Sequence, residues 1–328
     1  MSGQLGVALR DLLPPAGPRG AMPARAIVDL AVTAERSGYH SVWLPEGRGR
    51  ESFAQLGAMA LATSRIQLGT GILPVFSRQP TLAAMGIATL DDLSGGRMNL
   101  GIGAGHTKFR HPLRAVREFV EIVRLVMTGR PVRYAGRVFR VEEFTLEFTP
   151  ARQVPIFLAA LRSGMLRLAG ELGGGVLLNW VTTEQAARAA DTVREAAASL
   201  GHDPRDIIVA CFIRTCVTND MGGARMVLRR LIASYAALPS YAAMWTESGF
   251  GTEVAAIQQG WRSGIDAAAD SVSDRMVQAL GLIGTGAACS AGLEQFRQSG
   301  VDLPIIYPFP LRPADDAAYS QTIEALAP

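Results

Sequence analysis

The 328 residues of this chain are 48% hydrophobic and 19% charged, which supports a large core and excludes a disordered protein. The net charge of +3 is the small difference between 32 basic and 29 acidic residues without a basic tract, so nucleic acid is not an expected partner. The three cysteines and four histidines lie outside the spacings of metal sites, and no apolar run reaches the roughly 18 residues of a membrane span. We therefore expect a reduced, soluble, cytoplasmic protein without a metal or membrane contact.

Short apolar runs alternate with helix-like segments through the first third of the chain. The strands expected there are residues 4–9, 41–44, 66–68 and 98–102, and the helices are residues 24–37, 53–62, 80–93 and 113–127. Strand, loop, helix, strand is the order typical of a parallel sheet, in which the loops after the strands carry the chemistry.

The same alternation returns after residue 150, with two interruptions. The later strands are expected at residues 156–159, 175–178, 207–217 and 303–307, and the helices at 165–172, 183–200, 287–298 and 314–326. Residues 129–148 read as a hairpin insertion with Ala-Gly at its turn, and residues 224–280 as a helical insertion. Thr182 and Gln185 have the spacing of a capping box.

Eight strands that alternate with helices predict an α/β fold of the (β/α)8 TIM barrel class, with both insertions, in one domain over residues 1–328. An open doubly wound sheet is the alternative, and the strand count disfavours it. On a barrel the active site lies at the carboxyl ends of the strands, here residues 45–47, 70–72, 103–106, 160–165, 179–180 and 307–308. These positions carry few ionisable groups, so the chemistry is expected to come from a bound cofactor.

Each position also has a plainer interpretation. The glycines at 69–71 would let a flat ligand approach the backbone, or they form only a turn at a strand end. Residues 101–105 superficially match a dinucleotide fingerprint, but the third glycine and the acidic ribose ligand are missing. Glu46 is either an acid or a solvated carboxylate, and His106 either a proton donor or an ordinary loop histidine. Arg162 and Ser163 open a helix, where Ser163 would help to bind a phosphate or simply cap the helix.

Five segments resemble the luciferase-like monooxygenase superfamily, in its branch that uses the deazaflavin coenzyme F420 and includes methylenetetrahydromethanopterin reductase-like proteins. They are residues 41–47 (SVWLPEG), 66–72 (IQLGTGI), 89–105 (TLDDLSGGRMNLGIGAG), 155–180 (PIFLAALRSGMLRLAGELGGGVLLNW) and 300–308 (GVDLPIIYP). The resemblance implies a deazaflavin ring at the carboxyl face of the barrel, backed by a non-prolyl cis peptide at Gly71–Ile72. It also implies phosphate and tail contacts from residues 160–165, with Asn179 beside the cofactor.

The resemblance assigns the site residues of this chain, with some departures from the family. The catalytic candidates are Glu46 and His106. The implied cofactor-binding residues are Thr70, Gly71, Ile72, Gly103, Gly105, Ala160, Arg162, Ser163, Gly164, Met165 and Asn179. Gly47 stands where the family often has a histidine. His106 stands where sugar-phosphate dehydrogenases have an acid, which argues against that substrate. A carboxylate usual before the sixth strand is replaced within Gly173–Gly175.

The function that follows is an F420-dependent oxidoreductase, transferring a hydride between the deazaflavin and a small organic substrate. An FMN-dependent monooxygenase of the same superfamily is the first alternative, and a non-catalytic flavin-binding protein is the second. We also expect a homodimer, since luciferase-like barrels commonly pair. The apolar helices at residues 227–261 would form its interface or, alternatively, a lid over the site.

Overall fold

Eight parallel strands close into a barrel in the computed structural model, which describes residues 3–10, 22–47, 49–105 and 109–328. Each strand pairs with the next around the ring, and the pairing of β9 with β10 and of β12 with β1 closes it. The predicted TIM barrel is therefore confirmed. In ring order the strands are β1 (Gly6–Ala8), β2 (Ser41–Leu44), β3 (Gln67–Thr70), β5 (Met98–Gly103), β8 (Ile156–Ala159), β9 (Gly175–Asn179), β10 (Ile208–Val217) and β12 (Leu303–Pro308).

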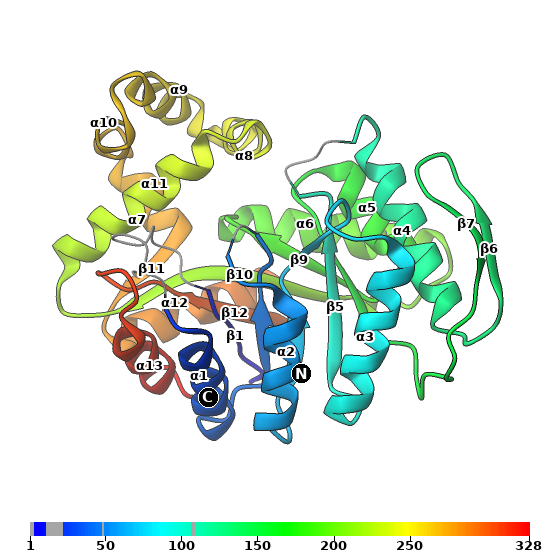
Figure 1. Cartoon of the computed structure of the whole chain (residues 1–328). Coiled ribbons are helices and arrows are strands. Elements are labelled where there is room, and N and C mark those ends of the chain that lie inside the picture. The colour runs from blue at the N-terminus through cyan, green and yellow to red at the C-terminus, as the bar shows by residue number, and fades with distance from the viewer. Residues whose placement is uncertain (1–2, 11–21, 48, 106–108) are drawn as a thin grey trace.

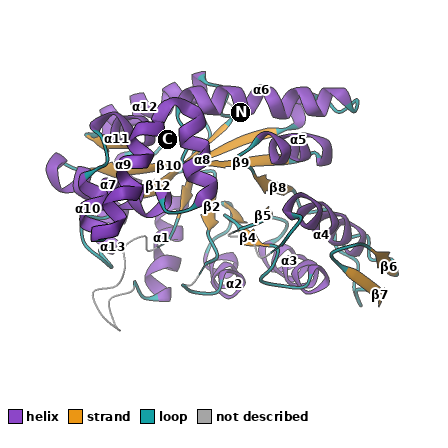
Figure 2. Ribbon diagram, turned by 90° about the horizontal axis from the view of Figure 1, so that it is seen from above, coloured by secondary structure: helices purple, strands orange, loops and turns teal. Residues whose placement is uncertain are grey.

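Helices surround this barrel (Figures 1 and 2), and the side chains that they bury are mostly apolar. In α4 (Pro112–Val126), for example, apolar side chains recur at helical spacing and form one buried face. The Thr182 capping box forms as predicted at the start of α6. The surrounding helices are α1 (Ala24–Arg36), α2 (Ser52–Ala62), α3 (Pro80–Ser94), α4 (Pro112–Val126), α5 (Ser163–Leu172), α6 (Thr183–Ser199), α12 (Gly286–Gln298) and α13 (Asp316–Ala325).

Two short strands were not predicted. β4 (Leu73–Pro74) pairs with β5, and β11 (Gly281–Gly284) pairs with β10 beside the barrel. β4 is too short to show an alternating pattern. β11 directly follows the predicted helical segment of residues 224–280 and has only four residues, two of them glycines, so no strand pattern marks it.

Two segments extend from the barrel on opposite sides of the molecule (Figure 1). An antiparallel hairpin of β6 (Val132–Ala135) and β7 (Arg140–Phe144) lies beside α4, where a hairpin was predicted. The other segment is a group of helices between β10 and β11. Its helices are α7 (Met221–Ala236), α8 (Pro239–Trp245), the π-helical turn Thr246–Phe250, α9 (Gly251–Gly260), α10 (Ile265–Asp270) and α11 (Asp274–Leu280). Within the described residues no helix is both long and apolar enough to cross a bilayer.

Large aromatic side chains fill the inside of the barrel. Trp43 packs edge-on against both Phe157 and Phe212, with ring centroids 5.1 and 6.4 Å apart. Phe212 also contacts Tyr307, at 5.9 Å. These rings fit because glycines face them: an added Cβ at Gly69 would lie 2.6 Å from the Trp43 ring. The interior is therefore a packed core, and a ligand can bind only above it, at the barrel mouth.

Candidate active site

The peptide bond between Gly71 and Ile72 is cis, as expected from the resemblance. It follows β3 directly, and both sides of it are tied to the end of β2. The Gly71 amide donates to the Leu44 carbonyl at 2.8 Å, and the Ile72 carbonyl accepts from the Glu46 amide at 3.2 Å. Thr70 is fully buried and donates its hydroxyl to the Gly101 carbonyl at 2.8 Å. The backbone of this bulge is thus fixed by its two neighbouring strands.

Glycines allow the bulge and its neighbours to pack closely against one another. A Cβ at Gly71 would lie 2.7 Å from the Phe212 ring, and one at Gly103 would lie 3.1 Å from Ile72. Gly105 has φ +63°, and its Cβ would meet the Phe76 ring at 2.7 Å. Gly101 is more restricted still, because a Cβ there would lie 2.0 Å from the Thr70 carbonyl oxygen. Gly71 and Ile72 themselves are only half-buried, so the bulge stays accessible at the mouth, as a flat ring stacked on it would require.

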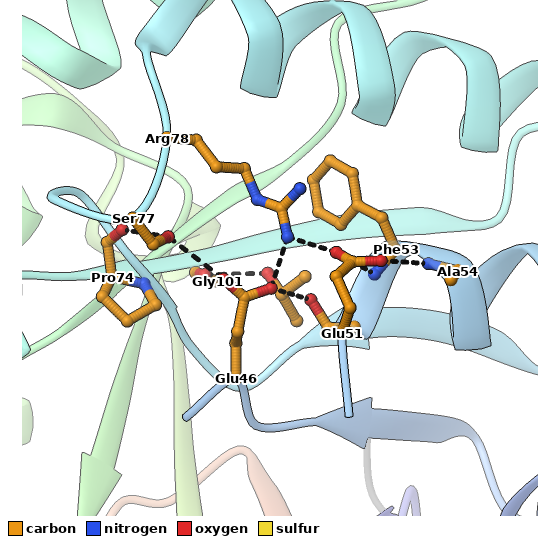
Figure 3. A network of polar contacts seen from close by, with 10 residues as sticks. Glu46, Glu51, Phe53, Ala54, Pro74, Ser77, Arg78 and Gly101 are labelled. Atoms are coloured by element: carbon orange, nitrogen blue, oxygen red, sulfur yellow. Dashed lines mark hydrogen bonds and ion pairs between the residues drawn. The ribbon is translucent and has the colours of Figure 1, made fainter. Parts of the chain in front are cut away.

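Glu46 lies in a dense polar network after β2 (Figure 3). Its carboxylate accepts from the Ser52 hydroxyl at 2.7 Å, the Ser77 hydroxyl at 3.0 Å and the Arg78 guanidinium at 2.5 Å. Arg78 also bonds to Glu51, the residue that caps α2. Burial acts to raise the pKa of Glu51, but the backbone donors of α2 and Arg78 outweigh it and hold that pKa below its ordinary value.

The network makes Glu46 a well-held carboxylate rather than a solvated one, since its side chain is only 10% exposed. It connects β2 to the segment between β4 and α3, which carries Ser77 and Arg78. His106, the second residue expected to handle protons, lies outside the described residues.

The loop after β8 leads into α5 as predicted. Of the two interpretations of Ser163, the one in which it caps the helix is wrong. The residue before the helix is Arg162, and no side chain caps α5, because Ser163 is already its first helical residue. Ala160 is buried, while Arg162 and Ser163 are exposed and Gly164 and Met165 half-buried. An uncapped helix start with an arginine beside it suits a phosphate. Arg162 pairs at 2.8 Å with Glu247, and both side chains are about 60% exposed, so this pair contributes at most about 1 kcal/mol.

Asn179 ends β9 and joins a group of residues that the sequence did not predict. Its amide oxygen accepts from the Arg214 guanidinium at 2.9 Å, and its amide nitrogen donates to the Tyr241 hydroxyl at 2.7 Å. Arg214 lies in β10 with only 1% of its surface exposed. Ala210 and Phe212 of the same strand belong to the core inside the barrel, so the alternation of the strand turns Arg214 inward as well.

Aromatic rings surround the Arg214 guanidinium. Its carbon lies 4.2 Å from the centre of the Trp180 ring and 4.1 Å from that of Tyr307, with Tyr235 at 5.8 Å. Each such contact contributes up to about 2 kcal/mol, whereas burying a charge without a counter-ion costs several. The guanidinium donates one hydrogen bond, from Nη1 to Asn179, and its Nε and Nη2 have no partner in the described part of the chain. Arg214 is therefore poorly compensated by the protein itself.

The α7 and α8 helices hold this group in place. Trp180 has φ +58°, a left-handed conformation that is rare for a bulky residue, and its carbonyl accepts from the Trp245 indole at 2.9 Å. Tyr235 and Trp245 also pack on the Trp180 ring, at 5.0 and 6.2 Å. Burial raises the pKa of Tyr307 to about 12, against the opposing effect of the nearby Arg10 and Arg214 charges. The aromatic residues of the helical segment thus cover one side of the mouth.

Arg214 had a signal in the sequence. It is the one charged residue in the run IIVACFIRTCV, at a position where a buried strand requires an apolar side chain or a polar role. The strand ends considered in the sequence did not include the end of this strand, so Arg214 was not predicted. Of the predicted residues, the structure groups Thr70, Gly71, Ile72, Gly103 and Gly105 around the bulge. It places Asn179 with Arg214, and Arg162 at the exposed start of α5.

Known proteins resemble this chain in sequence. The family model described as luciferase-like monooxygenase matches residues 4–303. The 5,10-methylenetetrahydromethanopterin reductase of Archaeoglobus fulgidus is 32% identical over 61% of this chain, and the match spans only 63% of that protein. The reductase of the same name from Methanolobus tindarius is 26% identical over 85% of this chain and 89% of its own.

Solved structures share the fold. The coenzyme F420 dependent tetrahydromethanopterin reductase of Methanopyrus kandleri superposes with a TM-score of 0.84 at 23% identity, covering 99% of this chain and 97% of its own. An oxygenating monooxygenase subunit from Pseudomonas putida, solved in complex with FMN, has a TM-score of 0.70 at 18% identity, covering 100% and 97%. The barrel is thus common to proteins named for F420 and to one solved with FMN.

Proposed function

Because this chain belongs to the luciferase-like monooxygenase family, we propose that it is an F420-dependent oxidoreductase. It would transfer a hydride between the deazaflavin and a small organic substrate. The observation that carries the proposal is the half-buried bulge at Gly71–Ile72, which β2 and β5 hold in place at the barrel mouth. Relatives named as F420-dependent or as methylenetetrahydromethanopterin reductases support the choice of cofactor.

The residues present fit such a ring and tail. Gly71 and Ile72 would back the ring, and Gly103 and Gly105 would lie along its edge. The uncapped start of α5, with Arg162 and Ser163, would hold the phosphate of the tail. When bound, the deazaflavin supplies the hydride chemistry, so the chain's own tasks are to bind, orient and exclude water.

Glu46 remains our proposal for the group that handles a proton. Its position directly after β2 is at the catalytic face of the barrel, and Ser52, Ser77 and Arg78 fix its orientation. Those three donors also give Glu46 a second possible task, which is to hold the segment after β4 in place. The two roles differ in what a substitution would do to cofactor affinity.

An FMN-dependent monooxygenase is the second candidate, and the bulge at Gly71–Ile72 favours it equally. A backbone surface does not distinguish a flavin from its 5-carba analogue, and one structure with this fold contains FMN. The two differ in chemistry, because a flavin activates oxygen whereas the deazaflavin reacts poorly with it.

Parallel titrations of the purified protein with F420 and with FMN test the proposal. Saturable binding of F420, with FMN much weaker, is the expected result. Tight FMN binding with no response to F420 would replace the proposal with the monooxygenase. Binding of either cofactor without turnover on any of a broad substrate panel would favour a non-catalytic flavin-binding protein.

A further inference from the structure

The unsatisfied atoms of Arg214 lie on one edge of its guanidinium. Nη1 is used by Asn179, while Nε and Nη2 are buried and have no hydrogen-bond partner among the described residues. In an arginine these two nitrogens can form the side-on fork that binds both oxygens of a carboxylate. Buried polar groups are almost always paired in folded proteins, so an empty fork indicates a ligand that is absent here.

The surroundings of the fork restrict what can bind it. Trp180 follows β9 and Tyr307 lies in β12, the two strands that flank β10, and their rings lie 4.2 and 4.1 Å from the guanidinium carbon. The two free nitrogens and their hydrogens lie in one plane. That plane matches the two oxygens of a planar carboxylate better than the tetrahedral oxygens of a phosphate.

The charges nearby point the same way. The groups that face Arg214 are Asn179, Trp180 and the tyrosines at 235, 241 and 307, with Arg10 a further cation near Tyr307. None of these is an acid. The anion that would complete the site must therefore come from a bound molecule.

We propose that Arg214 binds a carboxylate group of the substrate, which makes the substrate a small organic acid or a molecule with a carboxylate arm. Ile72 packs against the same inner cluster as Phe212 and Tyr307, and Arg214 lies one inward position beyond Phe212 on β10. The carboxylate would thus be held on the side of the mouth opposite the bulge. The claim that this carboxylate belongs to the substrate rests on the proposed function. The claim that Arg214 binds a carboxylate does not.

Acetate is the smallest suitable probe, and acetamide is its neutral match in shape. Titrations at constant ionic strength, with and without F420, would follow probe binding by the rise in unfolding temperature and by ligand-observed NMR. Acetate should bind and acetamide should not, and inorganic phosphate should bind more weakly than acetate. Arg214→Lys keeps the charge without the fork, Arg214→Gln removes both, and Arg205→Gln alters an arginine whose side chain is 89% exposed.

Acetate binding should weaken about tenfold or more in both Arg214 variants and remain unchanged in Arg205→Gln. A second readout separates binding from a merely structural role. Arg214→Gln should unfold at no lower temperature than the parent protein without ligand, because it removes an uncompensated buried charge. Equal acetate binding by parent and Arg214→Gln would overturn the proposal, and so would preferred phosphate binding.

F420 affinity should stay within about threefold in the Arg214 variants, a change too small for a lost charged contact. A loss of F420 affinity as large as the loss of acetate binding would assign the fork to the cofactor and overturn the proposal. If the parent protein binds acetate through Arg214 but not F420, the proposed function fails while the carboxylate site stands.

Discussion

Gly71 shows how a single missing Cβ shapes the mouth. Its substitution by alanine would place a methyl group 2.7 Å from the Phe212 ring and 3.3 Å from the Trp43 Cβ, inside a packed core. We expect Gly71→Ala to lower the free energy of unfolding by about 1–3 kcal/mol and to weaken F420 binding, because the bulge must shift. Chemical denaturation and F420 titration measure the two effects.

The control is Gly57→Ala in α2, whose new Cβ would meet the Leu90 side chain at an ordinary 3.6 Å. That variant should be stabilised by up to about 1 kcal/mol, because alanine favours the helix, and should bind F420 normally. If Gly71→Ala proves as stable and as active as Gly57→Ala, the bulge does not depend on the close contact described here.

Glu46→Gln tests proton transfer at the other side of the bulge. If Glu46 carries the proton, turnover should fall about 10²–10⁴-fold while F420 affinity stays near that of the parent, because an amide keeps the shape and some of the hydrogen bonds. Steady-state kinetics with a binding titration checks this. Unchanged turnover would exclude the role, and a parallel loss of affinity and turnover would assign Glu46 to holding the loop.

Residues at strand ends could be identified from the sequence because a barrel places all such ends on one face. Gly71, Ile72 and Asn179 were found in this way. The fork at Arg214 could not be identified from strand ends. It depends on which residues of β10 point into the barrel and on the rings of Trp180 and Tyr307. Those contacts join segments more than 30 residues apart in sequence, and no local pattern records them.

At the scale of elements, Glu118 attaches the β6–β7 hairpin to α4. Its buried carboxylate accepts from the backbone amides of Arg137, Val138 and Phe139 at 2.8–2.9 Å. Burial acts to raise the pKa of Glu118, but these three donors outweigh it and hold that pKa below its ordinary value of 4.5. The ionised form is therefore the one that stabilises the fold.

Glu118→Gln should cost about 1–3 kcal/mol of unfolding free energy at neutral pH, because it replaces an acceptor with a donor among three amides. Because folding lowers the pKa of Glu118, its carboxylate contributes fully to the unfolding free energy above the unfolded pKa near 4.5. That contribution is lost as the pH falls through the folded pKa. Denaturation of the parent and of Glu118→Gln from pH 7 to acid should show their difference in unfolding free energy narrowing below pH 4.5. A difference independent of pH would contradict this assignment.

The start of α5 makes a separate prediction about the cofactor tail. Arg162→Gln should weaken binding of F420 about tenfold, the loss of one charge-assisted contact, and leave binding of the bare deazaflavin ring unchanged. Glu247→Gln is the matched control, because it releases Arg162 from its exposed partner and should not weaken F420 binding. Equal losses for ring and whole cofactor in Arg162→Gln would place the tail elsewhere.

For the molecule as a whole, the sequence predicted the eight barrel strands to within a few residues, because each is a short apolar run bounded by turns. The helical segment from α7 to α11 was recognised as helical, but its contacts were not. Its aromatic residues Tyr235, Tyr241 and Trp245 pack towards Trp180 at the barrel mouth, which agrees with the lid interpretation of residues 227–261.

The homodimer remains a prediction. If the chain pairs, light scattering should give twice the 34.9 kDa of one chain. A stable mass of one chain across a concentration series would reject the dimer. Tyr235, Tyr241 and Trp245 pack within the protein, so a dimer interface on this helical segment would have to use its other faces.

A crystal structure of the protein with F420 bound tests the central claim most directly. The account predicts the deazaflavin ring against the Gly71–Ile72 backbone, its tail phosphate at the start of α5, and its open face towards the side of the mouth that carries Arg214. A ring bound elsewhere, or one whose open face is turned away from Arg214, would contradict it.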